Sequence, residues 1–334
     1  MKGRLENKIK IEKFLQNKIS DMPEYMHKYY YSMSSKSHTT KMRYIDNAIR
    51  FMNHFNGGCL TKEQLNNITE FDIQRYISDI KYIESSDGEV KELEESTQCN
   101  IYSCLWSFFT FLYRTKYIEK NPFDNIFERP TVKEKGIVYL EPEEVRKIES
   151  AILNNGVGSK VAVGRQRNWK YRDALLFRIP VVNGLRVTAL SEINVEDIDL
   201  NARKIRVVEK GNISKSVDFD IKTASYIRQW LKDREILLDG KKEHALFISN
   251  QRTRITVRSI ERIVIKYCDE VVPEKHITPH GLRRTCGTNT YKITNDIHMV
   301  SKILGHKTTS PTRRYAAVDD RDRTDVINHV AYLY

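Results

Sequence analysis

The sequence predicts a mainly helical protein with a small antiparallel β-sheet, divided into a helical-bundle domain and a mixed α+β domain. Apolar residues recur at helical spacing through much of residues 1–127. Two short β-patterned runs flank one turn in the second half of the chain. A charged segment with almost no apolar residue separates the two regions. The length of 334 residues also suggests two domains, at roughly 150 residues per domain.

The first region is expected to be a helical bundle. Residues 1–20 predict a short amphipathic extension ahead of a domain at 21–127. An apolar stripe from Ile101 to Leu112 predicts a core helix, while the acidic residues 84–95 predict a loop and a helix start. Asn121 and Pro122 close the region. Helix start and stop signals lie at Pro23, Ser37, Gly57 with Gly58, Thr61 with Gln64, and Thr69 with Asp72.

The second region is expected to mix helices with a hairpin. Residues 128–138, which carry Pro and alternating charge, are predicted to be the linker, and the second domain spans 139–334. Residues 204–208 and 216–220 predict two strands around a turn at 209–212. The remaining helices are expected at 221–236, 257–270, 281–293, 296–304 and 323–331.

Composition excludes several classes of protein. The 56 Lys and Arg residues exceed the 44 Asp and Glu residues by 12, which makes a polyanion the leading hypothesis for the partner. The sequence holds no apolar run of about 18 residues, so we expect no membrane span, and its polar start predicts no signal peptide. The five cysteines lack CxxC spacing. We therefore expect reduced thiols, a cytoplasmic protein and no zinc or other metal site.

Four short motifs in the second domain share one kind of chemistry. They are a Gly-Leu-Arg turn, a lysine in the hairpin turn, a His-x-x-Arg pair, and Leu-Gly-His followed nine residues later by tyrosine. Arginine matches phosphate oxygens, histidine and lysine can move protons, and tyrosine can form a covalent phosphoester. Each residue alone would suggest only a surface side chain, but their combination predicts phosphoryl transfer without a metal ion or other cofactor. The residues are Arg186, Lys210, His280, Arg283, His306 and Tyr315.

The order and spacing of these residues resemble the tyrosine recombinase (phage integrase, Xer-like) family over about residues 139–320. The resemblance implies that Tyr315 attacks DNA to give a 3′-phosphotyrosyl bond. It implies further that Arg186, Arg283 and His306 hold the phosphate, Lys210 protonates the leaving 5′-oxygen and His280 assists proton transfer. Two positions depart from the family pattern: Ala189 stands where an acidic residue is usual, and Arg284 where histidine is common. The departures raise the question of how Arg186 is oriented.

The resemblance also implies the partners. The two domains would clamp double-stranded DNA, and strand exchange would run through a Holliday junction in a homotetramer, with residues 323–334 docking in cis or on a neighbour. The sequence leaves open whether an accessory DNA-bending protein takes part. A nucleoid-associated protein is expected. Candidate phosphate contacts are Lys36, Lys41, Arg43, Arg252, Arg254, Arg258 and Arg284.

Several functions remain open at this stage. Integration and excision of a mobile element is the preferred role, because the motif residues are atypical. Xer-like dimer resolution and DNA inversion use the same chemistry. A type IB topoisomerase is less consistent with the Leu-Gly-His to tyrosine spacing. A non-catalytic DNA-binding regulator is the alternative from another class.

Overall fold

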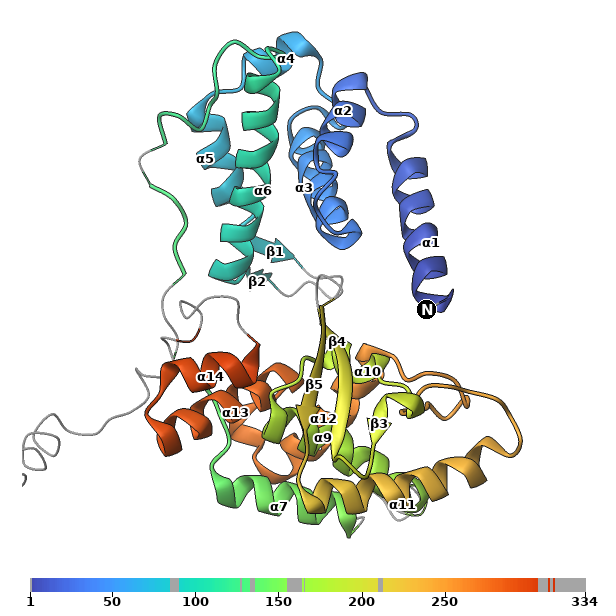
Figure 1. Ribbon diagram of the computed structural model, residues 1–334. Coiled ribbons are helices and arrows are strands. Elements are labelled where there is room, and N and C mark those ends of the chain that lie inside the picture. Colours follow the sequence, from blue (N-terminus) through green and yellow to red (C-terminus); the bar gives the residue numbers. More distant parts are fainter. Residues whose placement is uncertain are drawn as a thin grey trace, which may run out of the picture. The chain divides into compact units, whose positions relative to one another are not determined.

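The computed structural model describes residues 2–84, 90–126, 128–132, 136–154, 164, 166–209, 213–305, 312 and 315 (Figure 1). The chain forms two compact units, residues 1–134 and 135–334. The boundary between them falls inside the segment 128–138, where the sequence predicts a linker.

The first unit is a helical bundle with one small hairpin. Its aromatic core gathers around Phe51, Phe108 and Phe109, which are fully buried. The ring centroids of Phe51 and Phe109 lie 5.4 Å apart, edge to face. Its elements are α1 (Lys2–Ile19), α2 (Glu24–Ser32), α3 (His38–Asn56), α4 (Lys62–Asn66), α5 (Glu70–Asp79), β1 (Tyr82–Glu84), β2 (Val90–Glu92) and α6 (Glu95–Arg114).

Local capping signals begin and end these helices where the sequence predicts. Ser37 accepts a hydrogen bond from the Thr40 backbone N–H at the start of α3, and Gly57 ends α3 in the left-handed conformation. Thr61 and Gln64 form a capping box at α4. These predictions succeed because a cap is a contact between residues three apart in the chain.

The hairpin of the first unit was not predicted. We expected a loop and a helix start over 84–95, but β1 and β2 pair antiparallel, with Tyr82 opposite Glu92 and Glu84 opposite Val90. The helix start at Glu95 is confirmed. The strands have three residues each and carry charged side chains, so the apolar alternation that signals a strand is weak here.

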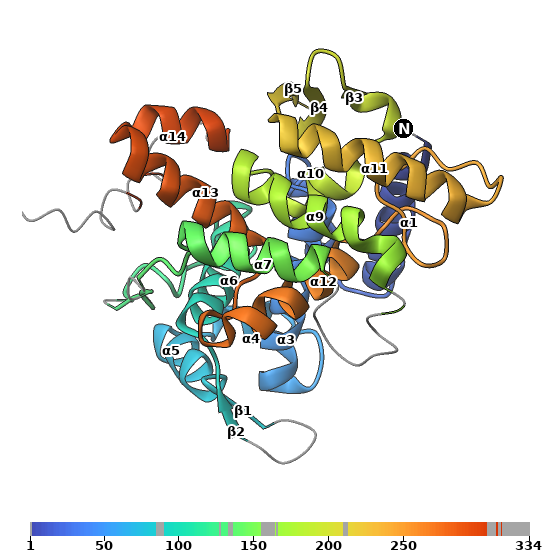
Figure 2. The same ribbon diagram turned by 90° about the horizontal axis from the view of Figure 1, so that it is seen from below.

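The second unit packs helices around a buried central helix. α9 contacts α7, α11, α12 and α13 (Figure 2), and its side chains from Arg172 to Val181 are nearly all buried. A helix covered on several sides is apolar all round. The elements are α7 (Pro142–Leu153), η1 (Arg167–Trp169), α9 (Lys170–Asn183), α10 (Val187–Glu192), η2 (Val195–Asp197), β3 (Ile198–Asp199), β4 (Lys204–Glu209), β5 (Ile213–Asp218), α11 (Ile221–Leu238), α12 (Val257–Val271), η3 (Pro273–Lys275), α13 (Pro279–Thr294) and α14 (Ile297–Leu304).

The sheet of the second unit is antiparallel with the order β3-β4-β5. Its last strand differs from the prediction of 216–220: β5 runs from Ile213 to Asp218 because it pairs along all of β4, from Glu209 opposite Ile213 to Lys204 opposite Asp218. Phe219 lies outside the strand and is buried in the core. The two-residue strand β3 was not predicted, and the predicted helix 323–331 lies outside the described residues. The fold class, mainly helical with a small antiparallel sheet, is confirmed.

Candidate active site

The Gly-Leu-Arg turn joins α9 to α10. Gly184 ends α9 with φ of 61°, a left-handed conformation that favours glycine. A Cβ atom added there would lie 2.5 Å from Cδ2 of Leu304 and 3.3 Å from Sγ of Cys286. Glycine is therefore required both by conformation and by space. Leu185, the next residue, is buried. Arg186 follows it, half-buried, at the N-cap of α10.

Arg283 on α13 binds the ends of two other helices. Only 3% of this residue is exposed. Its Nη1 donates a hydrogen bond to the carbonyl oxygen of Gly184, and its Nη2 donates to that of Leu304. These carbonyls lie at the C-terminal ends of α9 and α14, where intrahelical partners are lacking. One buried guanidinium therefore fixes the turn that carries Arg186 and the turn that precedes His306.

Tyr315 lies against the same helix as Arg283. Its ring is 4% exposed and packs with Cys286, Val300 and Leu304. A Cβ atom added to Gly287 would lie 2.8 Å from Cζ of Tyr315, so the ring rests on the helix backbone at Gly287. Gly287 is four residues after Arg283, on the same face of α13. The structure therefore places the predicted nucleophile one helical turn from the predicted phosphate ligand.

Of the other predicted catalytic residues, His280 lies among the described residues, whereas Lys210 and His306 do not. His280 lies exposed in the first turn of α13, three residues from Arg283. The chain around it is fixed by Thr278, whose side chain caps α13 by accepting from the Gly281 N–H. Lys210 and His306 lie outside the described residues. The structure therefore brings Arg283, Tyr315 and the Arg186 turn together, and it does not test the positions of Lys210 and His306.

Cys286 lies within this cluster as a packing residue. Burial raises the pKa of its thiol to about 11, so the thiol stays protonated at neutral pH and behaves as a small apolar group. All five cysteines are free thiols in the structure. Among the described residues, no group of three or more His, Cys, Asp or Glu side chains is placed to hold a metal ion.

Some of the candidate phosphate contacts are exposed, and others are at least partly buried. Exposed ones are Lys36, Arg43, Arg252 and Arg258. Lys41 is buried, and its ammonium lies 4.5 Å from the ring centroid of Tyr30. Arg254 donates to backbone carbonyls of its own unit, and Arg284 is half-buried beside Arg283. Lys41 and Arg254 thus have packing partners that the sequence did not reveal.

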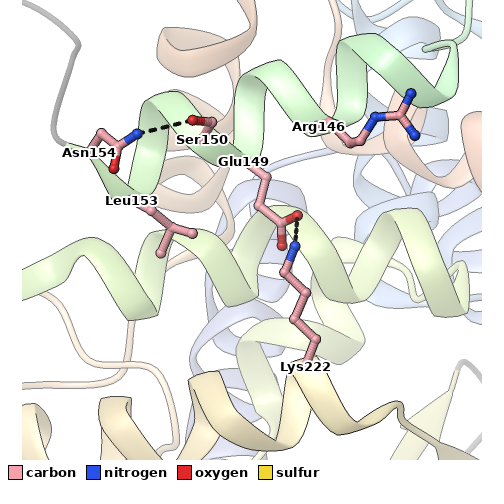
Figure 3. A pocket seen from close by; sticks show the side chains of 6 residues that line it. All are labelled: Arg146, Glu149, Ser150, Leu153, Asn154 and Lys222. Atoms are coloured by element: carbon pink, nitrogen blue, oxygen red, sulfur yellow. Dashed lines mark hydrogen bonds and ion pairs between the residues drawn. The ribbon is translucent and has the colours of Figure 1, made fainter.

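A hollow of about 300 Å³ in the second unit is separate from this cluster (Figure 3). Glu149 of α7 is buried there and forms ion pairs with Lys222 at 2.7 Å and Arg178 at 3.1 Å. Arg178 also pairs with Asp220 at 3.1 Å. The carboxylates are already neutralised, so these contacts bridge α7, α9 and α11. We assign the hollow a structural role.

Sequence reasoning missed the contacts that two residues make inside the second unit. Gly287 was not singled out, although a glycine inside a helix costs about 1 kcal/mol relative to alanine and often marks a close approach. Arg254 was interpreted as a DNA contact, and no sequence signal distinguishes it from its exposed neighbours. None of the described helices is both long enough and apolar enough to span a membrane.

Comparison with known proteins identifies the family of this chain. Residues 161–322 match the phage integrase family. The chain is 30% identical over 239 residues to tyrosine recombinase XerC of Vibrio vulnificus strain YJ016, covering 72% of this chain and 71% of that one. It is 26% identical over 280 residues to tyrosine recombinase XerC of Vibrio cholerae strain M66-2, covering 82% and 83%.

Solved structures share the fold. XerH recombinase bound to palindromic difH substrate, a post-cleavage complex, has a TM-score of 0.67 at 21% identity, covering 88% of this chain and 81% of that one. The Tn1549 transposon integrase with circular intermediate DNA has a TM-score of 0.68 at 18% identity, covering 93% and 98%. The solved structures show the fold, and the XerC relative at 30% identity over 72% of the chain shows the class of protein. The chain belongs to the tyrosine recombinase family and is a site-specific DNA recombinase.

Proposed function

We propose that this recombinase cuts and rejoins DNA through a covalent bond to Tyr315, and that it integrates and excises a mobile element. One observation carries the mechanism: the Tyr315 ring lies one turn from Arg283 on α13, while Arg283 fixes the Arg186 turn and the end of α14. A nucleophile and phosphate-binding donors at one place are what phosphoryl transfer requires.

The proposed step balances without a cofactor. The Tyr315 oxygen attacks the scissile phosphorus and loses its proton, with His280 assisting the transfer. The bond from phosphorus to the 5′-oxygen breaks, and Lys210 supplies the proton to that oxygen. Arg186, Arg283 and His306 stabilise the negative charge on the non-bridging oxygens. The phosphotyrosyl bond conserves the energy of the broken bond, so a second 5′-hydroxyl can reverse the reaction without ATP.

Strand exchange in this proposal joins two DNA sites in a homotetramer through a Holliday junction. The exposed side chains of Lys36, Arg43, Arg252 and Arg258 contact phosphates and make binding salt-dependent. The XerH structure is bound to palindromic difH substrate and the Tn1549 integrase structure is in complex with circular intermediate DNA, which supports duplex DNA as the partner. Docking of residues 323–334, either in cis or on a neighbouring copy, belongs to the same proposal.

Two observations bear on the biological role. The motif residues depart from the family pattern at Ala189 and Arg284, which favours a mobile-element enzyme. The relatives named tyrosine recombinase XerC favour a second candidate, Xer-like resolution of DNA dimers. Both roles use the same cleavage chemistry and differ in the DNA sites that the protein cuts.

Covalent trapping in the native host tests the proposal. Wild type and Tyr315→Phe are expressed, the cells are lysed in denaturant, and DNA bound to the protein is sequenced. We expect DNA from a few discrete sites with wild type and none with Tyr315→Phe. Paired sites flanking one element support integration and excision, whereas a single site near the replication terminus supports dimer resolution and inverted pairs support inversion.

Two outcomes would contradict the proposal. Reversible DNA binding by both proteins without covalent DNA would favour a non-catalytic regulator. Relaxation of supercoils without recombinants in a two-site assay would favour a type IB topoisomerase.

A further inference from the structure

Arg186 begins a helix that is too short to hold its own orientation. α10 has six residues, less than two turns, and isolated helices of this length are not stable in water. The direction of the Arg186 side chain therefore depends on what fixes the two ends of α10. At its N-terminal end, Arg283 binds the carbonyl of Gly184, two residues before Arg186.

At its C-terminal end, α10 is held by a second arginine. Nη1 of Arg254 donates to the carbonyl oxygens of Ser191 at 2.9 Å and Ile193 at 3.3 Å. Nη2 donates to the side-chain oxygen of Asn194. The last carbonyls of a helix lack intrahelical partners and carry partial negative charge. A guanidinium fork can satisfy several of them at once.

The backbone of Arg254 is also fixed. The backbone N–H of Arg254 donates to the carboxylate of Glu243 at 3.2 Å, and Arg254 forms an isolated β-bridge with Ile248. Asn194, just after α10, forms a second bridge with Ala245. The segment 243–254 thus presents the guanidinium to the end of α10 from a supported position.

The neighbouring arginines have different environments. Arg252 is exposed and forms an ion pair with Asp239 at 3.6 Å, where both side chains are about half or more exposed to solvent. Arg258 lies exposed on α12. Arg252, Arg254 and Arg258 look alike in the sequence, yet among them it is Arg254 whose donors bind α10.

We propose that Arg254 is a positioning residue for the recombination reaction: it holds the C-terminal end of α10 so that Arg186 is presented to the scissile phosphate. Arg283 and Arg254 then bracket Arg186 from the two ends of its turn and helix. The inference rests on the proposed role of Arg186 in binding the phosphate. It replaces the expectation that Arg254 contacts DNA.

The test separates DNA binding from cleavage. The probe is a duplex carrying the DNA site recovered by covalent trapping, with a nick beside the cleavage position so that the released fragment is lost and the covalent complex accumulates. Full-length wild type, Arg254→Gln, Arg254→Lys, Arg228→Gln and Arg186→Ala are compared. For each we measure Kd over a range of KCl concentrations, the rate of covalent-complex formation at saturating protein, and Tm.

The expected result is a loss of rate without a loss of binding. Because an error of about 1 Å in a catalytic group can cost up to about 100-fold, Arg254→Gln should lower the covalent rate about 10- to 100-fold, with Kd and its salt dependence unchanged. Arg254→Lys keeps the charge but lacks the fork, so its rate should fall between wild type and Arg254→Gln. Arg228→Gln, at an exposed position of α11 outside the proposed DNA contacts, should bind and cleave like wild type.

Three results would overturn the inference. If Arg254→Gln lowers the slope of log Kd against log salt by about one while the bound complex cleaves normally, Arg254 is a phosphate contact. If Tm, binding and cleavage fall together in both Arg254 variants, its role is merely structural. If Arg186→Ala cleaves like wild type, the proposed role of Arg186 fails and the inference fails with it, while Tyr315 chemistry still stands if wild type forms the covalent complex.

Discussion

The core of the first unit and the candidate site of the second unit are stabilised in different ways. In the first unit, aromatic side chains from several helices fill one core around Phe51 and Phe109. At the site in the second unit, buried Arg283 and half-buried Arg254 hold the ends of helices through backbone carbonyls. Apolar packing is spread over many contacts, whereas the site depends on a few polar donors. This difference predicts which single substitutions lower the rate of DNA cleavage and which lower the stability of the fold.

The largest effect is expected at Arg283. Arg283→Ala removes a phosphate donor and leaves the carbonyls of Gly184 and Leu304 without this partner. Covalent-complex formation should fall at least about 100- to 1000-fold, the cost of one transition-state donor, and stability by about 1–3 kcal/mol for each stranded carbonyl. Cleavage on a nicked duplex and urea unfolding measure the two. The matched control is Arg284→Ala, and equal losses in both variants would contradict this assignment.

A substitution in the core of the first unit should lower the stability of that unit and leave the second unit unchanged. Phe109→Ala leaves a cavity between Phe51, Phe108 and Phe123, which contact its ring, and should destabilise the first unit by about 3–5 kcal/mol. Hydrogen exchange of peptides measures this by region. Faster exchange is expected within residues 2–132, with residues 136–305 unchanged. Exposed Trp106 on α6 offers a control, since Trp106→Ala should leave exchange near the wild-type rate.

A smaller effect is expected where Tyr315 rests on α13. Gly287→Val places branched carbons where the Tyr315 ring lies, so the ring must move away from the turn that holds Arg283. The covalent rate should fall about 10- to 100-fold while Kd for DNA stays unchanged. Gly281→Ala is the control on the same helix, because its nearest neighbour, Ile277, would lie 3.3 Å away and is a side chain that can shift. An unchanged rate of cleavage by Gly287→Val would show that the catalytic position of the Tyr315 ring does not depend on its contact with Gly287.

The smallest effect concerns the polar bridge between α9 and α11. Burial raises the pKa of Asp220, but hydrogen bonds from Thr223 and the charge of Arg178 outweigh it, so the pKa is lowered overall. A lowered pKa stabilises the folded state above the unfolded pKa, near 4, and this contribution is lost as pH falls through the lower folded value. Because the carboxylate is partly exposed, we expect about 1 kcal/mol or less.

Chemical unfolding of wild type and Asp220→Asn over a range of pH measures this contribution. The stability difference should be constant at neutral pH and shrink below about pH 4. A difference that stays the same in acid would mean that the carboxylate charge contributes nothing.

The same contrast explains which features the sequence could predict. The helices of the first unit and their caps at Ser37 and Thr61 follow from residues close in the chain, and the sequence predicts them. The catalytic motif was predicted from its resemblance to a family. The end of β5 was wrong because its length depends on pairing with β4, and the β1–β2 hairpin was missed because its strands are short and charged.

Contacts between distant segments could not be predicted. Arg254 lies 63 residues after Ser191, and Arg283 lies 99 residues after Gly184. Nothing in the local pattern around Arg254 distinguishes it from Arg252 or Arg258. An arginine that binds carbonyls and one that binds phosphate have the same sequence signature, and the fold is needed to tell them apart.

The most direct test of the account is to identify the residue that carries DNA after cleavage. The trapped covalent complex is digested with nuclease and protease, and mass spectrometry locates the peptide that bears a nucleotide through its 3′-phosphate. We predict that this adduct lies on Tyr315 alone among the 18 tyrosines and is absent from Tyr315→Phe. An adduct on another residue, or a 5′-phosphate linkage, would contradict the mechanism.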